Sequence, residues 1–514
     1  EGREDADPER LMHHWRAAGQ NRRAVDYAFA AARRAADALE FHRAVELYQT
    51  ALAEQLPPDV ERATRMELAE VLLFVGQPSM AADEFMAASR GALREQAIDL
   101  RRRAALALFS ATEIERSAEL MADVTAALAL PVEKKAGLLS GLFGRKPARF
   151  TAAGAFFERR APENIATIDV VTLDALATAS IEMGVVHPQR AFDAHSRFLE
   201  LSCNVGDSIR YARALCAEAV WKASVDPTAS SRVDHLLATA EAAAAIDGGA
   251  LERAQIQLTR AITAFQLGNL QVAQAAIGDS LVALESDCRG AVWETRTARM
   301  YAGWIAWQAG DLSTFITQSR DWYDTAISNG DYFGASTLTM GIGNLAWALQ
   351  RDPTQAQELV DNAHQLWANR PVPMHHLMVA VAQVNLELLR GNAHAAADRL
   401  SKYESIHSKV DLDRLHLVGT TLSSMRMHVA IARANVAQAA QDAKALQAAL
   451  NVIRNERKQQ RIASPTNEAL LTQMNAALLS FSDAPAAIDE FRRAVTLYKQ
   501  VGQTMVATAC RWRA

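Results

Sequence analysis

The segment from Gly137 to Pro147 comes closest in this sequence to a phosphate-binding loop. It reads GLLSGLFGRKP, with three glycines followed by a basic pair. In a working loop of this kind a lysine meets the phosphates, and the Ser or Thr after it holds magnesium. Pro147 stands where that hydroxyl is needed, and no strand–helix–strand pattern surrounds the glycines. We therefore interpret the segment as a basic linker.

Histidines, cysteines and serines are not spaced for catalysis or for metal binding. His13-His14 and His375-His376 are adjacent pairs, whereas a helix presents two metal ligands at positions i and i+4. The sequence contains no HExxH, no Gly-x-Ser-x-Gly and no set of kinase motifs. The four cysteines form no CxxC pair. We expect no catalytic residue, no metal and no cofactor in this chain, which is therefore not expected to be an enzyme.

Large side chains of one hairpin are the strongest candidates for binding. When the repeats are aligned on the turn at Gly310, side chains of this hairpin and of the next two fall at first-helix positions that would face a concave groove. They are Met300, Trp304, Trp307, Leu345, Asn385 and Leu388. Aromatic rings in a groove can hold a peptide or a flat ligand at low entropic cost. The alternative is that the tryptophans fill space between helices.

Basic residues form a second candidate set, on either side of a predicted boundary near residue 130. They are Arg101, Arg102, Arg103, Lys134, Lys135, Arg145, Lys146 and Arg149. Such a patch could receive an acidic partner, a phosphate group or nucleic acid. No aromatic residues are interleaved for base stacking, so nucleic acid is not the expected partner. The alternative is a solvated helix face followed by a linker.

The elements that must position these residues are helices in a repeated pattern. Ala44, Tyr48 and Ala51 place a small, an aromatic and a small side chain on one helix face. The same order recurs after later turns, at Ala81, Phe85 and Ala88 and at Ala487, Phe491 and Ala494. This order resembles the second helix of the tetratricopeptide repeat. The resemblance implies an all-α fold of helical hairpins stacked into an α-solenoid, which usually serves as a binding surface.

The spacing of the small anchor positions predicts the domain organisation. The anchors Ala44, Ala81 and Ala118 are followed, after an irregular middle, by a second series: Ala273, Phe315, Ala356, Ala396 and Ala487. Glycines and prolines gather between residues 131 and 165. We predict an N-terminal array over 1–130, an irregular basic junction over 131–165 and a C-terminal array over 166–514.

Composition limits the class of protein and its expected location. The 514 residues are half hydrophobic, carry a net charge of −5 and include only 24 glycines and 14 prolines. These values suit packed helices and give no general affinity for nucleic acid. No run of 18 apolar residues and no signal-peptide pattern is present, and the scattered cysteines suit a reducing compartment. We expect a cytoplasmic protein without membrane attachment.

A more specific resemblance extends over most of the chain. Its first part, HHWRAAG from His13 to Gly19, resembles the region after the nucleotide-binding part of bacterial STAND-type ATPases. Later parts resemble the C-terminal region of bacterial serine/threonine protein kinases that carry a predicted ATPase: Ile168–Val170, Pro188–Ala191, Gly206–Asp207, Cys288–Arg299 and Gly310–Leu312.

This resemblance implies a non-catalytic sensor or protein-interaction region that binds a partner protein, a peptide or a small-molecule effector. It transfers no catalytic residue, because the kinase and ATPase motifs of that family lie outside these 514 positions. The resemblance implies either the tail of such a kinase–ATPase or a relative that lacks the upstream domains, and the sequence, which begins with Glu1, does not decide between the two. Two alternatives remain open: a free-standing adaptor scaffold, and a regulatory part of a larger enzyme. The pattern does not predict an oligomeric state.

Overall fold

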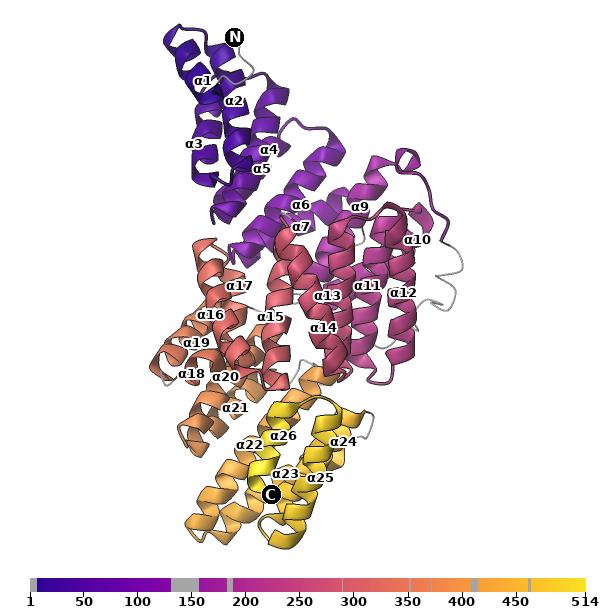
Figure 1. Ribbon diagram of the computed structural model, residues 1–514, viewed down its shortest axis with the longest axis vertical. Coiled ribbons are helices and arrows are strands. Elements are labelled where there is room, and N and C mark those ends of the chain that lie inside the picture. The colour runs from indigo at the N-terminus through magenta and orange to yellow at the C-terminus, as the bar shows by residue number, and fades with distance from the viewer. Residues whose placement is uncertain are drawn as a thin grey trace. The chain divides into compact units, whose positions relative to one another are not determined.

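The computed structural model describes residues 7–130, 157–182, 188–288, 290–350, 353–370, 372–407, 415–460 and 464–514. Within these ranges every regular element is a helix, and no strand occurs. Successive helices pair as antiparallel hairpins, and each hairpin packs on the next (Figure 1). The predicted fold is confirmed: the chain forms tetratricopeptide-like helical hairpins stacked as an α-solenoid.

The described residues divide into two compact units. The first unit runs to residue 130 and also takes in residues 165–179 and 323–335. The ring of Phe109 packs on that of Phe333 with centroids 4.6 Å apart, and Arg102 Nη1 donates to Thr178 Oγ1 at 3.2 Å. Its helices are α1 (Pro8–Ala17), α2 (Asn21–Asp37), α3 (Phe41–Leu52), α4 (Pro58–Phe74), α5 (Pro78–Ser89), α6 (Arg94–Ser110), α7 (Ile114–Ala127) and α9 (Thr167–Ala177).

The second unit holds the remaining described residues. Its elements, of which α16 and α17 also reach into the first unit, are η2 (Pro162–Asn164), η3 (Thr178–Glu182), α10 (Pro188–Val205), α11 (Ser208–Val225), α12 (Ser230–Asp247), α13 (Ala250–Gln266), α14 (Leu270–Ser286), α15 (Val292–Ala309), α16 (Leu312–Ser328), α17 (Tyr332–Thr339), η4 (Gly341–Asn344), α18 (Leu345–Ala348), α19 (Pro353–Trp367), α20 (Pro373–Leu389), α21 (Ala393–His407), α22 (His416–Ala439), α23 (Ala443–Gln459), α24 (Pro465–Leu479), α25 (Ala484–Gln500) and α26 (Thr504–Arg513).

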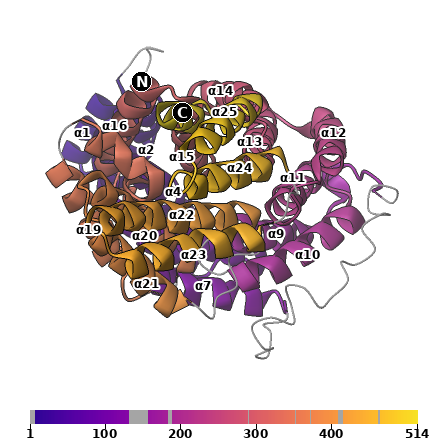
Figure 2. The same cartoon turned by 90° about the horizontal axis from the view of Figure 1, so that it is seen from below.

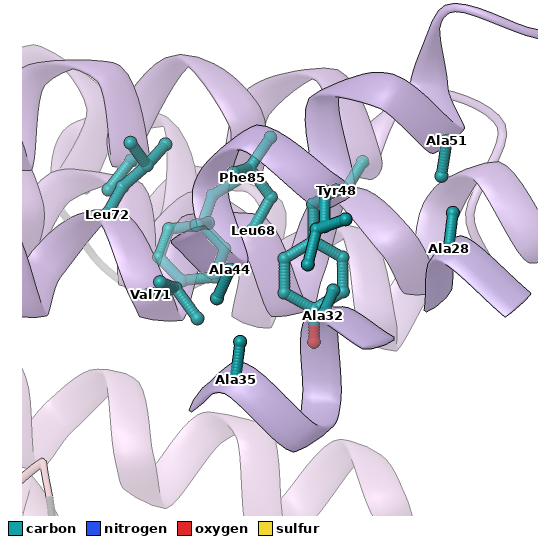
Figure 3. Packing of buried hydrophobic residues seen from close by; sticks show 14 of the residues in the cluster. Ala28, Ala32, Ala35, Ala44, Tyr48, Ala51, Leu68, Val71, Leu72 and Phe85 are labelled. Carbon is teal, nitrogen blue, oxygen red and sulfur yellow. The ribbon is translucent and has the colours of Figure 1, made fainter. Parts of the chain in front are cut away.

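The small anchors lie at close helix contacts, as the pattern predicts. Ala44, Ala81, Ala356 and Ala396 are all fully buried. In the first hairpins Ala44 and Ala51 face the alanine stripe of α2, and the ring of Tyr48 fills the space between them (Figure 3). Alanine on both sides lets two helix backbones approach, and the ring then packs at the density of a protein interior.

Two anchors differ from the prediction. In α7 the buried small residue is Ser117, whose hydroxyl donates to Ala105 O at 2.7 Å, whereas Ala118 is half-buried. The third anchor was therefore predicted one residue late. In α16 the anchor Phe315 is large, and the facing helix has Gly303 opposite it, where an added Cβ would lie 4.0 Å from the ring. A glycine on the partner helix compensates for the large anchor.

Polar contacts join each hairpin of the first unit to the next at a spacing of 33–34 residues. Arg33 Nε donates to Glu67 Oε2 at 2.9 Å, and Arg103 Nη1 donates to Glu70 Oε1 at 3.2 Å. Ser79 and Glu113, 34 residues apart, make the same kind of contact at 2.6 Å. Helices α2, α4 and α6 begin at Asn21, Pro58 and Arg94, so the structural repeat of this unit is 36–37 residues long. Each contact therefore joins positions that are about one helical turn out of register in neighbouring hairpins.

Tight turns join the two helices of most hairpins, and in several of these turns one residue has a positive φ. Glycine takes this position at Gly76, Gly268, Gly310 and Gly391, but Leu39 takes it between α2 and α3, with φ 64°. A side chain with a Cβ is strained in this left-handed conformation. The strain at Leu39 has no compensating burial, because its side chain is 60% exposed.

We expect Leu39→Gly to raise the free energy of unfolding of the first unit by about 1 kcal/mol, because glycine relieves the left-handed strain. Leu389→Gly is the matched control. Leu389 is also exposed, at 58%, but lies in the last turn of α20. That change should instead lower stability by up to about 1 kcal/mol. Urea denaturation of both variants gives the two signs, and a loss of stability for Leu39→Gly would contradict the strain argument.

Candidate functional site

The aromatic residues of α15 form a half-buried cluster with α13. The rings of Tyr301 and Trp304 lie with centroids 5.1 Å apart, and Phe265 of α13 packs on both, at 5.7 and 6.2 Å. All three side chains are intermediate in exposure. Burial raises the pKa of Tyr301 to about 12, so its phenol stays neutral at physiological pH. The cluster presents a firm apolar surface with one polar hydroxyl.

The other predicted groove residues are placed differently. Met300 and Trp307 are half-buried on α15, and the Trp307 ring packs on Phe315, 5.4 Å away. Leu345 is buried at 6% exposure, because the predicted first helix of its hairpin breaks into α17, η4 and α18. At that break Asn344 Nδ2 donates to Thr339 O and Ala356 O, at 3.1 and 2.8 Å. Leu345 therefore lines no open surface.

Asn385 and Leu388 lie on α20 and are both half-buried. Leu388 packs against the core between α20 and α22. Helix α15 contacts η4, and η4 contacts α20, so one element separates the aromatic cluster from these two residues. The structure thus brings together Trp304, Tyr301 and Phe265. Of these three, the sequence pattern singled out only Trp304.

Two arginines of the predicted basic patch form ion pairs with carboxylates of the first unit. Arg102 and Arg103 both donate to Asp99, at 2.6 and 2.8 Å, and Arg103 also reaches Glu70. Their charges, together with the hydrogen bonds, outweigh burial and hold the pKa of Asp99 below its usual value. The neighbouring Arg101 is half-buried. Five further members of the patch lie outside the described residues: Lys134, Lys135, Arg145, Lys146 and Arg149.

A pocket of about 280 Å³ opens between α4 and α6 in the first unit. Its lining combines carboxylates with an arginine, an amide and a thioether: Asp59, Arg62, Ala63, Met66, Glu67, Glu70 and Gln96. Glu67 and Glu70 are held by the contacts between hairpins, and Tyr48 also donates to Glu67 at 2.7 Å. The Arg62 Nε atom is buried without a hydrogen-bond partner. The pocket is therefore polar, with fixed walls.

The sequence patterns did not single out this pocket, because the glutamates of α4 and α5, which include Glu67, Glu70 and Glu84, belong to no recognisable motif. In the structure Glu84 accepts from Arg65 Nη1 at 2.7 Å, and the other two bind arginines of neighbouring hairpins. The signal was opposite charge at a separation of 33–34 residues, as in Arg33 with Glu67 and Glu70 with Arg103. A search at that spacing would have found the fixed carboxylates.

One buried cluster of titratable side chains joins α10 and α11. His195 Nε2 donates to Glu218 Oε2 at 2.8 Å, and Lys222 Nζ lies 3.2 Å from Glu218 Oε1. Burial alone would raise the pKa of Glu218. The hydrogen bond and charge of His195 and the charge of Lys222 outweigh burial, so the pKa lies below its usual value. His195 Nδ1 is buried without a hydrogen-bond partner, but the three groups pair with one another, which indicates a structural role for the cluster.

The described ranges hold neither a cluster of metal-ligand side chains nor a helix suited to cross a membrane. No group of three or more His, Cys, Asp or Glu side chains is arranged to hold a metal ion there. Among the described helices none is both long and apolar enough to cross a membrane. The surfaces that remain are the pocket between α4 and α6 and the aromatic cluster of α13 and α15.

Comparison with known proteins returns similarity to solved structures only. No protein-family model and no curated protein matches the sequence. Yeast Tom70 aligns over 95% of this chain and 96% of its own, at 12% identity and a TM-score of 0.33. The human IFIT1 dimer with m7Gppp-AAAA aligns over 89% and 93%, at 12% identity and a TM-score of 0.39.

A third similar structure is a STAND protein with a tetratricopeptide repeat sensor from Pyrococcus horikoshii. It aligns over 79% of this chain and 53% of its own, at 11% identity and a TM-score of 0.27. At these identities and TM-scores the likeness carries no argument about ligands or partners. The function proposed below rests on the side chains of this chain.

Proposed function

We propose that this chain is a non-catalytic binding scaffold that holds an extended segment of a partner protein on its first-helix surfaces. The observation that carries the proposal is the half-buried cluster of Phe265, Tyr301 and Trp304, whose rings pack on one another and still reach the surface. Rigid aromatic side chains bind a peptide with little loss of conformational entropy. Trp307 and Met300 are half-buried on the same helix.

The test uses peptides selected from a display library against the whole chain. We expect Trp304→Ala to weaken binding of a selected peptide by about 2 kcal/mol, roughly thirty-fold, as truncation of an aromatic anchor does. The free energy of unfolding should change less, because Trp304 contacts mainly Phe265 and Tyr301. Isothermal calorimetry and urea denaturation measure the two quantities on one sample.

The control is Trp293→Ala on the same helix. Trp293 is half-buried and packs against the core between α13, α14 and α15, so its truncation should cost about 3 kcal/mol of stability, the low end of the range for a buried tryptophan. Binding measured on the folded fraction should be unchanged. If Trp304→Ala loses stability like Trp293→Ala and keeps its affinity, the cluster is a core and this proposal fails.

We further propose that the scaffold is the sensor region of a bacterial signalling ATPase or kinase. The support is the sequence resemblance from His13 to Gly19 and from Cys288 to Arg299. In this view residues 1–130 and 166–514 are the two arrays, joined by 131–165. Partner binding would shift the population of an inhibited upstream domain. Reading the gene upstream of the codon for Glu1 tests this: a P-loop or kinase motif supports a sensor, and a nearby start codon favours a free-standing adaptor.

A further inference from the structure

In the second unit, the C-terminal hairpin contacts hairpins that precede it by more than 150 residues. Turns make three of these contacts. The turn glycine Gly268, between α13 and α14, lies against Thr466 at the start of α24. Gly310, between α15 and α16, lies against Thr504 at the start of α26, and Gly502 lies against Leu270. Helix α26, which leads to the C-terminus marked in Figure 2, also contacts α15 directly.

These contacts require glycine because of the space as well as the conformation. A Cβ added to Gly268 would collide with Thr466 Oγ1, and one added to Gly502 would lie 3.0 Å from Leu270 Cβ. Both glycines also have positive φ, of 80° and 76°. By comparison, Gly391 has φ 74° and nothing within 4 Å of its Cβ position. The close approach is thus specific to the turns that meet.

The contact is weakly held. The apolar core of α24–α26, around Phe491 and Tyr498, is separate from the core of α13–α15, around Leu258 and Ile305. The two clusters share no residue, and the apolar contact between them that the glycine geometry shows is that of Leu270 with Gly502. Thr466 Oγ1 is buried there without a hydrogen-bond partner, which costs free energy. Gln266 Oε1 and Gln308 Oε1, each two residues before a turn glycine, are buried and unpaired as well.

We propose that α24–α26 act as a latch on the turns of α13–α16. The latch is closed in this structure and opens without unfolding either core. Opening returns Thr466 to water and frees the turn faces at Gly268 and Gly310. A partner that hydrogen-bonds these groups would bind the open state preferentially and shift the population toward it. The inference does not depend on the peptide-binding function proposed above.

Thiol labelling of Thr466→Cys tests the latch, with the native Cys510 as internal reference. Cys510 is buried in the core of α24–α26, at 1% exposure, so it reacts only when that core unfolds. We expect the introduced thiol to be labelled at least ten-fold faster than Cys510, and at least ten-fold slower than a fully exposed cysteine. Equal rates for the two thiols, or a rate equal to that of an exposed cysteine, would overturn the proposal.

A disulfide lock supplies the second measurement. A Cβ atom added to Gly310 lies 3.5 Å from Thr504 Cβ, a Cβ–Cβ distance that a disulfide can span. The test variant carries Gly310→Cys, Thr504→Cys and Thr466→Cys, and mass spectrometry confirms the disulfide between positions 310 and 504. With this disulfide formed, the thiol at position 466 should be labelled ten-fold more slowly, and reduction should restore the original rate. The control combines Gly391→Cys with Thr466→Cys and tests the effect of placing a cysteine at positive φ. It should leave the labelling rate at position 466 unchanged. If the labelling rate at position 466 is the same with and without the disulfide, α24–α26 do not act as a latch.

Discussion

Gly76→Ala is expected to lower the free energy of unfolding of the first unit by about 3 kcal/mol or more. Gly76 has φ 74°, and this conformation alone costs an alanine about 1–2 kcal/mol. In addition, the new Cβ would meet the backbone of the α16–α17 turn, at Asn329 C and at 2.6 Å from Gly330 N. Neither partner is a flexible side chain, so the two turns must separate, and overpacking of this kind costs a further 1–3 kcal/mol or so.

Gly391→Ala separates the two effects. Gly391 has the same φ of 74° but open space around its Cβ position, so its replacement should cost only about 1–2 kcal/mol. Native-state hydrogen exchange of α4 and α5, and of α20 and α21, gives local unfolding free energies for the two variants. Equal losses would mean that the turn-to-turn contact contributes nothing.

Glu218→Ala is expected to cost about 3–5 kcal/mol, because it leaves the charge of Lys222 and the ring of His195 buried without their shared acceptor. The carboxylate is almost inaccessible, at 8% side-chain exposure. The control is Glu241→Ala. Glu241 pairs with Arg260 at the surface, with 45% side-chain exposure, and its loss should cost less than about 1 kcal/mol.

The same cluster predicts an acid-dependent loss of stability. The pKa of Glu218 is lowered on folding, so the unfolded chain takes up a proton first as the pH falls. The contribution of Glu218 is therefore complete above the usual carboxyl pKa of about 4.5 and is lost as the pH falls below it. Urea denaturation between pH 7 and pH 3 should show this loss in the wild type. An equal acid dependence in Glu218→Ala would contradict the assignment.

The sequence predicted the hairpin fold because one physical requirement repeats. Two helices can pack closely only where small residues face each other, and Ala44, Ala81, Ala356 and Ala396 mark those places from the spacing alone. The turn glycines follow from the same logic, since only glycine takes a positive φ without strain. Neither inference needs knowledge of distant contacts, because each repeat packs on its neighbour.

What the sequence did not show depends on contacts between distant segments. Nothing near Gly76 indicates that Gly330 will lie against it, or that residues 323–335 join the first unit. The shift from Ala118 to Ser117 arises because a serine can hydrogen-bond across to Ala105 O and serve as a small residue too. In the aromatic cluster, Trp304 was predictable from repeat position. Phe265 was not predicted, because the repeat alignment compared α15 only with the two hairpins that follow it and did not include the hairpin before it.

The contact between Gly76 and Gly330 also sets an order of events during synthesis. The turn that contains Gly330 leaves the ribosome roughly 250 residues after the turn that contains Gly76. At a synthesis rate of about 5–20 residues per second, this delay is roughly 10–50 s. Over that interval α4 and α5 can stack on their neighbours but lack the turn that covers Gly76. The nascent N-terminal hairpins are thus an incomplete unit for longer than most local folding steps take, and this interval is when a chaperone would find them.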